Sequence, residues 1–186
     1  MNPLQVLAAV VLLLAAASTS SASVLEDACK SFAASHTDIG YDFCVKFFQA
    51  DKGSATADKR GLAVIAARIA GQDAGGVAKH IAALRASAKD KRIVQALSDC
   101  AEVYSSAVSQ AGTAARGVAS GSPAGLQSAV TALSAALDAP DTCEQGFQDL
   151  EVSSPLSNED HAFSKEAAIA LAVTSALLRQ NQAEQR

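Results

Sequence analysis

The most constraining feature of the chain is a run of apolar and small residues spaced alternately four and three positions apart. This spacing places the whole run on one stripe of an α-helix, and over more than three heptads it is typical of helices that pack in a bundle. The small members of the stripe would let a neighbouring helix approach closely. The residues of this seam are Ile93, Leu97, Cys100, Tyr104, Ala107, Ala111, Ala114 and Val118.

A second helical pattern precedes the seam. It begins near Ser54, where Ser, Thr and Asp residues offer N-caps and an acid for the first turn, and it extends to Leu84. Gly71, Gly75 and Gly76 interrupt its middle, and each glycine costs about 1 kcal/mol relative to Ala in a helix interior. The sequence therefore allows either one weakened helix or two helices with a break.

Two further helices are expected after the seam. The first runs from Pro123 to Asp138, with Pro suited to the first turn, and the last runs from about Asn158 to Gln180. We expect the segment 139–142 to be a loop and the polar stretch 145–160 to loop across one end of the bundle. Short connections make sequential helices antiparallel neighbours.

The N-terminal part of the chain predicts a helical hairpin. Two short helical segments, residues 24–35 and 41–50, flank Thr37 to Gly40, which have the chemistry of a turn. No strand pattern competes. The sequence thus predicts an all-α fold, an antiparallel up-down four-helix bundle over residues 53–186 preceded by an α-hairpin over residues 24–52.

Four cysteines are present, at positions 29, 44, 100 and 143. An even number in a secreted chain indicates two disulfides, because the spacings lack the clustered ligands of a metal site. A Cys29–Cys44 bond would lock the hairpin, and a Cys100–Cys143 bond would tie the seam helix to the segment after the next helix. Four cysteines allow three pairings, and the spacing alone does not choose among them.

Residues 1–23 are expected to form a secretory signal peptide. They contain no charged side chain and carry an unbroken apolar run from Val6 to Ala17, followed by small residues. Cleavage after Ala22 or Ser23 would suit this pattern. The run is shorter than the roughly 20 residues of a spanning helix, so we expect no membrane attachment after cleavage and a secreted domain over residues 24–186.

Charge and motif content favour a binding protein over a catalyst. The net charge of −4 argues against non-specific nucleic-acid binding, which needs a basic surface. His36, His80 and His161 are dispersed and are interpreted as solvent-exposed polar residues. The chain has no nucleophile elbow, phosphate-binding glycine loop or zinc-binding helix motif. We expect no catalytic residue, no metal and no cofactor, and an acid pair at Asp99 and Glu102 is interpreted as a solvated face.

Several segments together resemble the plant invertase/pectin methylesterase inhibitor family. The strongest combination is the helix Asp99-Cys100-Ala101-Glu102-Val103-Tyr104 with the later Thr142-Cys143-Glu144 and two N-terminal cysteines. The resemblance covers essentially the whole chain after residue 23, and it implies a four-helix bundle with an N-terminal hairpin. It also implies the disulfides Cys29–Cys44 and Cys100–Cys143, and a cell-wall protein that inhibits either pectin methylesterase or acid invertase.

The resemblance favours pectin methylesterase as the target, with acid invertase as the alternative. Invertase inhibitors of the tobacco type carry Pro-Lys-Phe in the loop that plugs the enzyme, whereas this chain has Pro123-Ala124-Gly125. Pectin methylesterase inhibitors cover the pectin cleft with bundle helices, and we expect a monomer that forms a 1:1 complex. A non-inhibitory secreted helical protein is a second alternative. The expected partner-binding residues are Asp99, Glu102, Tyr104, Ser106, Ser109 and Glu144.

Overall fold

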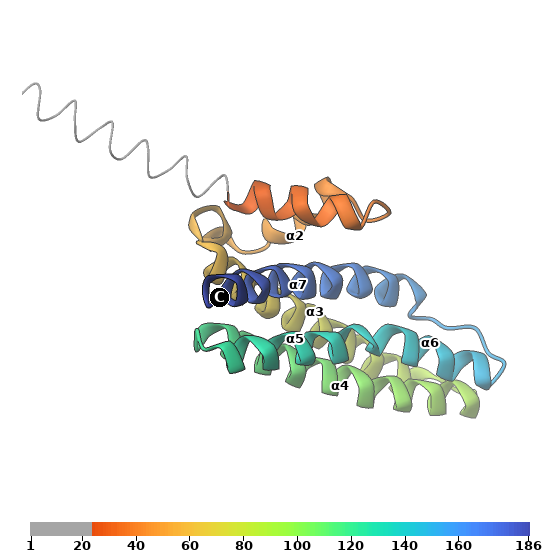
Figure 1. The fold of residues 1–186 in the computed structure, drawn as a ribbon. Coiled ribbons are helices and arrows are strands. Elements are labelled where there is room, and N and C mark those ends of the chain that lie inside the picture. Colours follow the sequence, from red (N-terminus) through yellow and green to blue (C-terminus); the bar gives the residue numbers. More distant parts are fainter. Residues whose placement is uncertain (1–23) are drawn as a thin grey trace, which may run out of the picture.

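The computed structural model describes residues 24–186, and the expected signal peptide lies outside the described residues. The described part is all-helical and contains no strand, as predicted. Four long rods lie side by side, and the N-terminal hairpin lies along one side of them, next to α7 (Figure 1). No helix within residues 24–186 is both long and apolar enough to cross a membrane.

The bundle is built from five helices because its third rod is broken. The rods are α3 (Lys59–Ser87), α4 (Lys91–Ala119), α5 (Pro123–Leu137) followed by α6 (Ala139–Asp149), and α7 (Ser157–Glu184). α5 and α6 follow one another end to end, and both contact α4 (Figure 1). The hairpin consists of helical residues 24–35 and α2 (Tyr41–Phe48), with a 3₁₀ turn, η1 (Lys52–Thr56), leading into α3.

The predicted loop over residues 139–142 is wrong, and the predicted loop over 145–160 is much shorter. The chain turns back into a helix at Ala139, with Pro140 in the first turn of α6, where its missing N–H costs nothing. Thr142 also donates its hydroxyl to the carbonyl of Asp138 at 2.8 Å. Only residues 150–156 remain outside helices between α6 and α7.

The start of α3 also differs from the prediction. Asp58 is the N-cap, because its carboxylate accepts the backbone N–H of Gly61 at 2.7 Å, and Ser54 lies buried in η1 instead. The helix then continues unbroken through Gly71, Gly75 and Gly76. Gly71 explains part of this continuity, since a Cβ there would lie 3.2 Å from the Cβ of Ala111 on α4. The missing side chain lets α3 and α4 pack closely, and this packing outweighs the low helix propensity of glycine.

The seam of α4 forms the centre of the core, as its spacing predicted. Its members from Leu97 to Val118 are at most 1% exposed, and only Ile93 at the end is half-buried. The disulfides are Cys29–Cys44 and Cys100–Cys143, the pairs that the family resemblance implies. With sequence separations of 15 and 43 residues, loop-closure entropy gives them about 3 and about 4 kcal/mol of stabilisation.

Candidate functional site

The outer face of α4 carries four of the six expected partner-binding residues. Asp99, Glu102, Ser106 and Ser109 are all exposed, and they follow one another in steps of three, four and three residues. Residues at these steps share one side of a helix. We call these four residues the α4 stripe. It presents two carboxylates and two short hydroxyls on the side of α4 that faces away from the seam.

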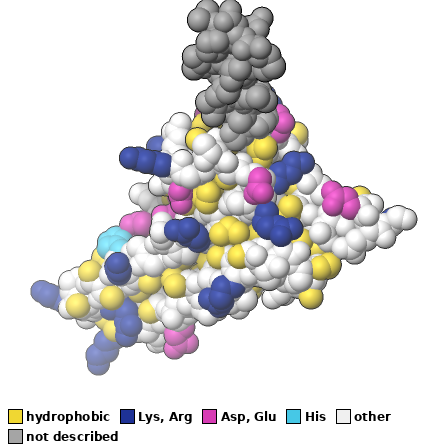
Figure 2. Space-filling view, turned by 90° about the vertical axis from the view of Figure 1, so that its left-hand side faces the viewer, with side chains coloured by type: hydrophobic (Ala, Val, Ile, Leu, Met, Phe, Trp, Pro, Cys, Tyr) yellow, Lys and Arg dark blue, Asp and Glu magenta, His cyan; other side chains and the backbone are white. Residues whose placement is uncertain are grey.

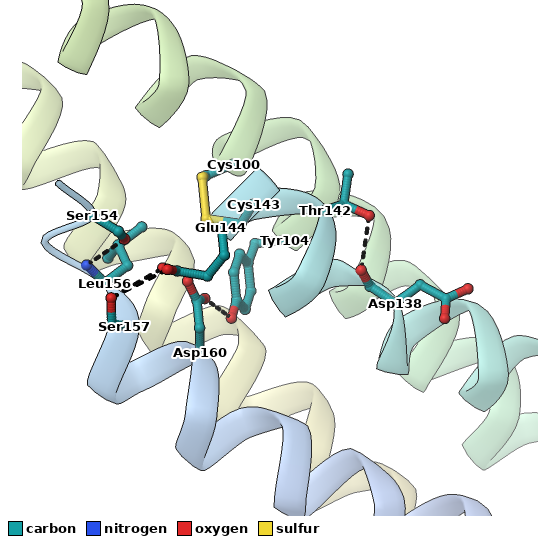
Figure 3. The surroundings of a disulfide bond; sticks show 10 residues. All are labelled: Cys100, Tyr104, Asp138, Thr142, Cys143, Glu144, Ser154, Leu156, Ser157 and Asp160. Carbon is teal, nitrogen blue, oxygen red and sulfur yellow. Dashed lines mark hydrogen bonds between the residues drawn. A yellow bond between two sulfur atoms is a disulfide. The ribbon is translucent and has the colours of Figure 1, made fainter. Parts of the chain in front are cut away.

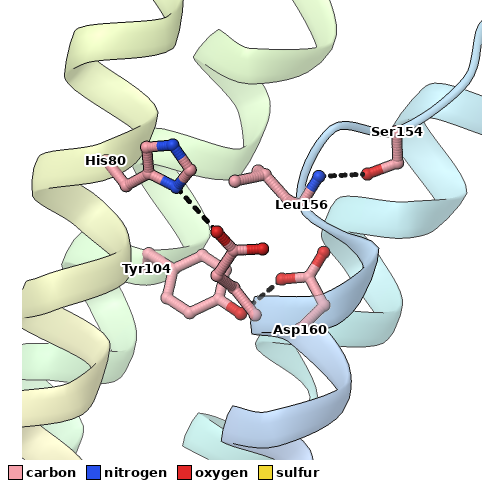
Figure 4. Close-up of polar contacts among 6 residues, drawn as sticks. His80, Tyr104, Ser154, Leu156 and Asp160 are labelled. Carbon is pink, nitrogen blue, oxygen red and sulfur yellow. Dashed lines mark hydrogen bonds and ion pairs between the residues drawn. The ribbon is translucent and has the colours of Figure 1, made fainter.

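Tyr104 does not belong to this surface, and its expected role as a partner contact is wrong. It is a seam residue with 0% exposure, and its ring packs against Phe163 of α7 with the centroids 5.4 Å apart. Its hydroxyl donates a hydrogen bond to Oδ1 of Asp160 (Figure 4). Tyr104 therefore joins α4 to α7 inside the bundle and offers no surface to a partner.

Glu144 is also turned away from the α4 stripe. It follows Cys143, whose disulfide to Cys100 ties α6 to α4, but its carboxylate points toward α7 (Figure 3). There it accepts a hydrogen bond from the hydroxyl of Ser157, with Oγ–Oε distances of 3.2 and 3.4 Å, and it lines a cavity together with Asp160. Glu144 is half-buried. Through its hydrogen bond with Ser157 it connects α6 to α7.

Burial governs the pKa values of Asp160 and Tyr104. The pKa of Asp160 is raised to about 7, chiefly because burial disfavours its charged form; the neighbouring Glu144 and Glu159 raise it further, while the hydrogen bond from Tyr104 lowers it. Burial and the Asp160 carboxyl hold the pKa of Tyr104 well above its usual range. At mildly acidic pH, Asp160 is therefore largely neutral and Tyr104 is a hydrogen-bond donor.

A histidine predicted to be a plain surface residue has a partner in the structure. His80 of α3 lies 2.8 Å from Glu159 of α7, measured from Nδ1 to Oε1, and its side chain is 44% exposed (Figure 4). The sequence did not predict a role for Glu159 or Asp160. A signal was available for Asp160, because it precedes Phe163 and Ala167 by three and seven residues and so shares their buried face.

The remaining histidine in the hairpin and the four cysteines take part in structural contacts. His36 stacks on Phe32 within the hairpin, with the ring centroids 4.3 Å apart, and lies far in sequence from the other two histidines. Within residues 24–186 all four cysteines are bonded, and no group of three or more His, Cys, Asp or Glu side chains is placed to hold a metal ion. On the face shown in Figure 2, basic and acidic side chains are scattered among apolar ones without forming one compact charged patch.

The turn from α4 to α5 is shaped by two glycines in contact. A Cβ built on Gly117 would lie 2.5 Å from the backbone oxygen of Gly125, and a Cβ on Gly125 would lie 2.5 Å from that of Gly117 and 2.2 Å from the hydroxyl of Ser120. The hydroxyl of Ser122 accepts the N–H of Gly125 at 3.0 Å and caps α5. Position 125 therefore has no room for a side chain in this turn.

Comparison with known proteins identifies the family. The sequence profile described as "Plant invertase/pectin methylesterase inhibitor" matches residues 23–173. A relative from Platanus orientalis that carries the name "Putative invertase inhibitor" is 35% identical over 158 residues, which cover 84% of this chain and 91% of the relative. "Pectinesterase inhibitor 2" of Arabidopsis thaliana is 29% identical over 133 residues, 72% of this chain and 75% of that protein.

The fold agrees with this result. The crystal structure of a mutant form of a pectin methylesterase inhibitor from Arabidopsis superposes with a TM-score of 0.62 at 25% identity, and the match covers 73% of this chain and 88% of that one. The family consists of protein inhibitors of enzymes and not of catalysts. The chain belongs to the plant invertase/pectin methylesterase inhibitor family.

Proposed function

We propose that this protein is a secreted inhibitor of pectin methylesterase. In this proposal the α4 stripe lies over the pectin-binding cleft of the enzyme, excludes the polymer, and so regulates the methylesterification of cell-wall homogalacturonan. The inhibition is steric, and it requires no group of the inhibitor to react. We expect one inhibitor molecule to bind one enzyme molecule.

The α4–α5 turn is the observation that carries the choice of target. By the resemblance stated above, invertase inhibitors of the tobacco type place a Lys and a Phe where this chain has Ala124 and Gly125. The contact of Gly125 with Gly117 and Ser120 leaves no space for an aromatic ring at position 125. A cationic, aromatic plug would require α4 and α5 to move apart, which argues against invertase as the target.

The alternative target is acid invertase, and a specific observation favours it. The relative from Platanus orientalis, which bears an invertase inhibitor name, shares 35% of its residues with this chain over 84% of the chain. The relative that bears a pectinesterase inhibitor name shares 29% over 72%. A direct comparison of both enzymes is therefore part of the test of function.

Secretion is proposed on two features of the chain. Residues 1–23 have the apolar core and small residues of a signal peptide. Both disulfides of the described part require an oxidising compartment to form and persist. Secretion to the cell wall agrees with both features. The cell wall is also where pectin methylesterase acts on pectin.

The proposed binding surface can be tested by placing a positive charge on the stripe. Glu102→Arg and Ser109→Arg should each weaken inhibition of a plant pectin methylesterase by about tenfold or more, because interface charges that meet a like charge on the partner cost several kcal/mol. Both positions are exposed, so the thermal unfolding midpoint should stay within about 2 °C. The measurement is the inhibition constant at fixed pH and salt.

A matched control is available in the hairpin. Asp38 is an exposed acid in the turn between the two hairpin helices, and Asp38→Arg changes the charge as Glu102→Arg does. This variant should inhibit like the parent protein. Equal loss of inhibition in Asp38→Arg and Glu102→Arg would mean that overall charge and not the α4 stripe governs binding, and unchanged inhibition in both stripe variants would move the interface elsewhere.

A further inference from the structure

A groove of about 450 Å³ lies between the first hairpin helix (residues 24–35), the start of α3 and the C-terminal part of α7. Its floor is apolar and buried, since Phe32, Leu62 and Val173 are at most 9% exposed. Alanines line it from both sides, among them Ala28 of the hairpin helix and Ala176 of α7, and their short side chains leave the space unfilled. The volume and the mostly apolar lining are those of a small-molecule site.

The groove is elongated along the two helices that form its sides. On the hairpin helix the lining residues recur every three or four positions from Val24 to Ser35, so they share one face of that helix. At the rise of an α-helix this face is about 16 Å long. On α7 the lining extends from Ala172 to Gln180, a distance of about 12 Å. An extended aliphatic chain would therefore fit along the groove.

One end of the groove is positively charged. The hairpin helix begins, α3 begins and α7 ends at the same end of the molecule (Figure 1). Lys59 is the first residue of α3, Arg179 lies near the end of α7, and both line the groove together with one acid, Asp27. Within residues 24–186 none of these three side chains forms an ion pair. Figure 2 looks onto this end, where basic and apolar side chains lie side by side.

We infer that this groove binds an aliphatic carboxylate, with its hydrocarbon chain between the hairpin helix and α7 and its carboxylate beside Lys59 and Arg179. A chain that covers the apolar floor removes it from water, so the affinity should rise with chain length. The two cations offer charge-assisted hydrogen bonds to a carboxylate and favour an anion over a cation of the same size. The juxtaposition of an elongated apolar groove with two unpaired cations at one end carries the inference.

The test is isothermal titration calorimetry at neutral pH of the purified protein that lacks residues 1–23, with octanoate, decanoate and octylammonium as ligands. Decanoate should bind as one molecule per chain and about tenfold more tightly than octanoate, because it buries two more CH₂ groups. Octylammonium has the same chain length as octanoate and the opposite charge, so it should bind about tenfold more weakly than octanoate. Bound decanoate should also raise the thermal unfolding midpoint, since it binds only the folded protein.

Substitutions separate the apolar part of the groove from its charged end. Ala176→Phe places a ring in the groove and should abolish decanoate binding, and Ala172→Leu makes the same test with a smaller side chain. Lys59→Gln combined with Arg179→Gln should remove the preference for octanoate over octylammonium. Lys52→Gln is the matched control, because Lys52 is exposed on η1 and does not line the groove, and it should bind all three ligands like the parent. Circular dichroism checks that each variant is folded.

Three results would overturn the inference: no binding of decanoate at millimolar concentration, equal affinities for octanoate and octylammonium, or parent-like binding in both folded groove variants. A dimer in sedimentation that Ala176→Phe dissociates would also overturn it, because a second copy of the chain would then fill the groove. Since the measurement uses the inhibitor alone, its outcome does not depend on which enzyme the protein inhibits.

Discussion

The hydroxyl of Tyr104 is the most consequential polar atom in the core. It donates to Asp160, a carboxyl that is 2% exposed and whose second oxygen is also buried. A buried acceptor that loses its donor costs far more than an exposed one, because water does not replace the lost partner. The pair also fixes the position of α7 relative to α4, since the two residues come from those helices.

Removal of this hydroxyl should destabilise the fold. Tyr104→Phe keeps the ring and its packing on Phe163 but leaves Oδ1 of Asp160 without a donor, which should cost about 1–3 kcal/mol. Urea denaturation at pH 5.5 measures the change. Tyr41 is the other tyrosine of the chain and is half-buried on α2, so Tyr41→Phe is the control and should change stability by less than about 0.5 kcal/mol. Equal stability of the two variants would show that the Tyr104–Asp160 bond contributes little.

At the scale of the helices, glycine has opposite effects at different positions. Gly117 on α4 and Gly125 on α5 let the two backbones touch, and Gly71 on α3 makes room for the side chain of Ala111 on α4. Gly76 on α3 has open space around it, with nothing within 4 Å of a Cβ built there. Propensity treats these glycines alike, so the sequence left the continuity of α3 undecided. The helix is continuous because of its packing against α4.

Alanine substitution should separate the two classes of glycine. Gly117→Ala places a Cβ 2.5 Å from the carbonyl oxygen of Gly125, and such overpacking should destabilise the protein by about 1–3 kcal/mol. Gly76→Ala should stabilise it by about 0.5–1 kcal/mol, since Ala loses less backbone entropy in a helix. Calorimetric unfolding would show opposite shifts of the midpoint. Two shifts of the same sign would contradict the close packing of α4 on α5.

At the scale of the whole molecule, the fold was predictable and the target was not. The four-three spacing from Ile93 to Val118 predicted a buried seam, and the predicted pattern of helices follows from burying such faces. The pairing of Asp160 with Tyr104 escaped prediction because the two residues lie 56 positions apart in the sequence, on different helices. Tyr104 was misplaced because the family motif drew attention to a position that the spacing itself assigns to the core.

The surface that selects an enzyme obeys different constraints from the core. Exposed residues such as Asp99 and Glu102 contribute little to folding, so neither helical spacing nor packing restricts which partner they fit. The tight turn at Gly117 and Gly125 is the exception, because packing there removes the space that an aromatic plug would need. The geometry of that turn therefore bears on which enzyme is the target. The contribution of the exposed residues to target choice has to be measured.

The most direct measurement mixes the purified protein, in separate assays, with a plant pectin methylesterase and with a plant acid invertase, and titrates the activity of each enzyme at mildly acidic pH. If the protein inhibits pectin methylesterase as proposed, pectin methylesterase activity should be lost stoichiometrically at a 1:1 ratio, with invertase activity unchanged. Loss of invertase activity while the esterase stays active would contradict it.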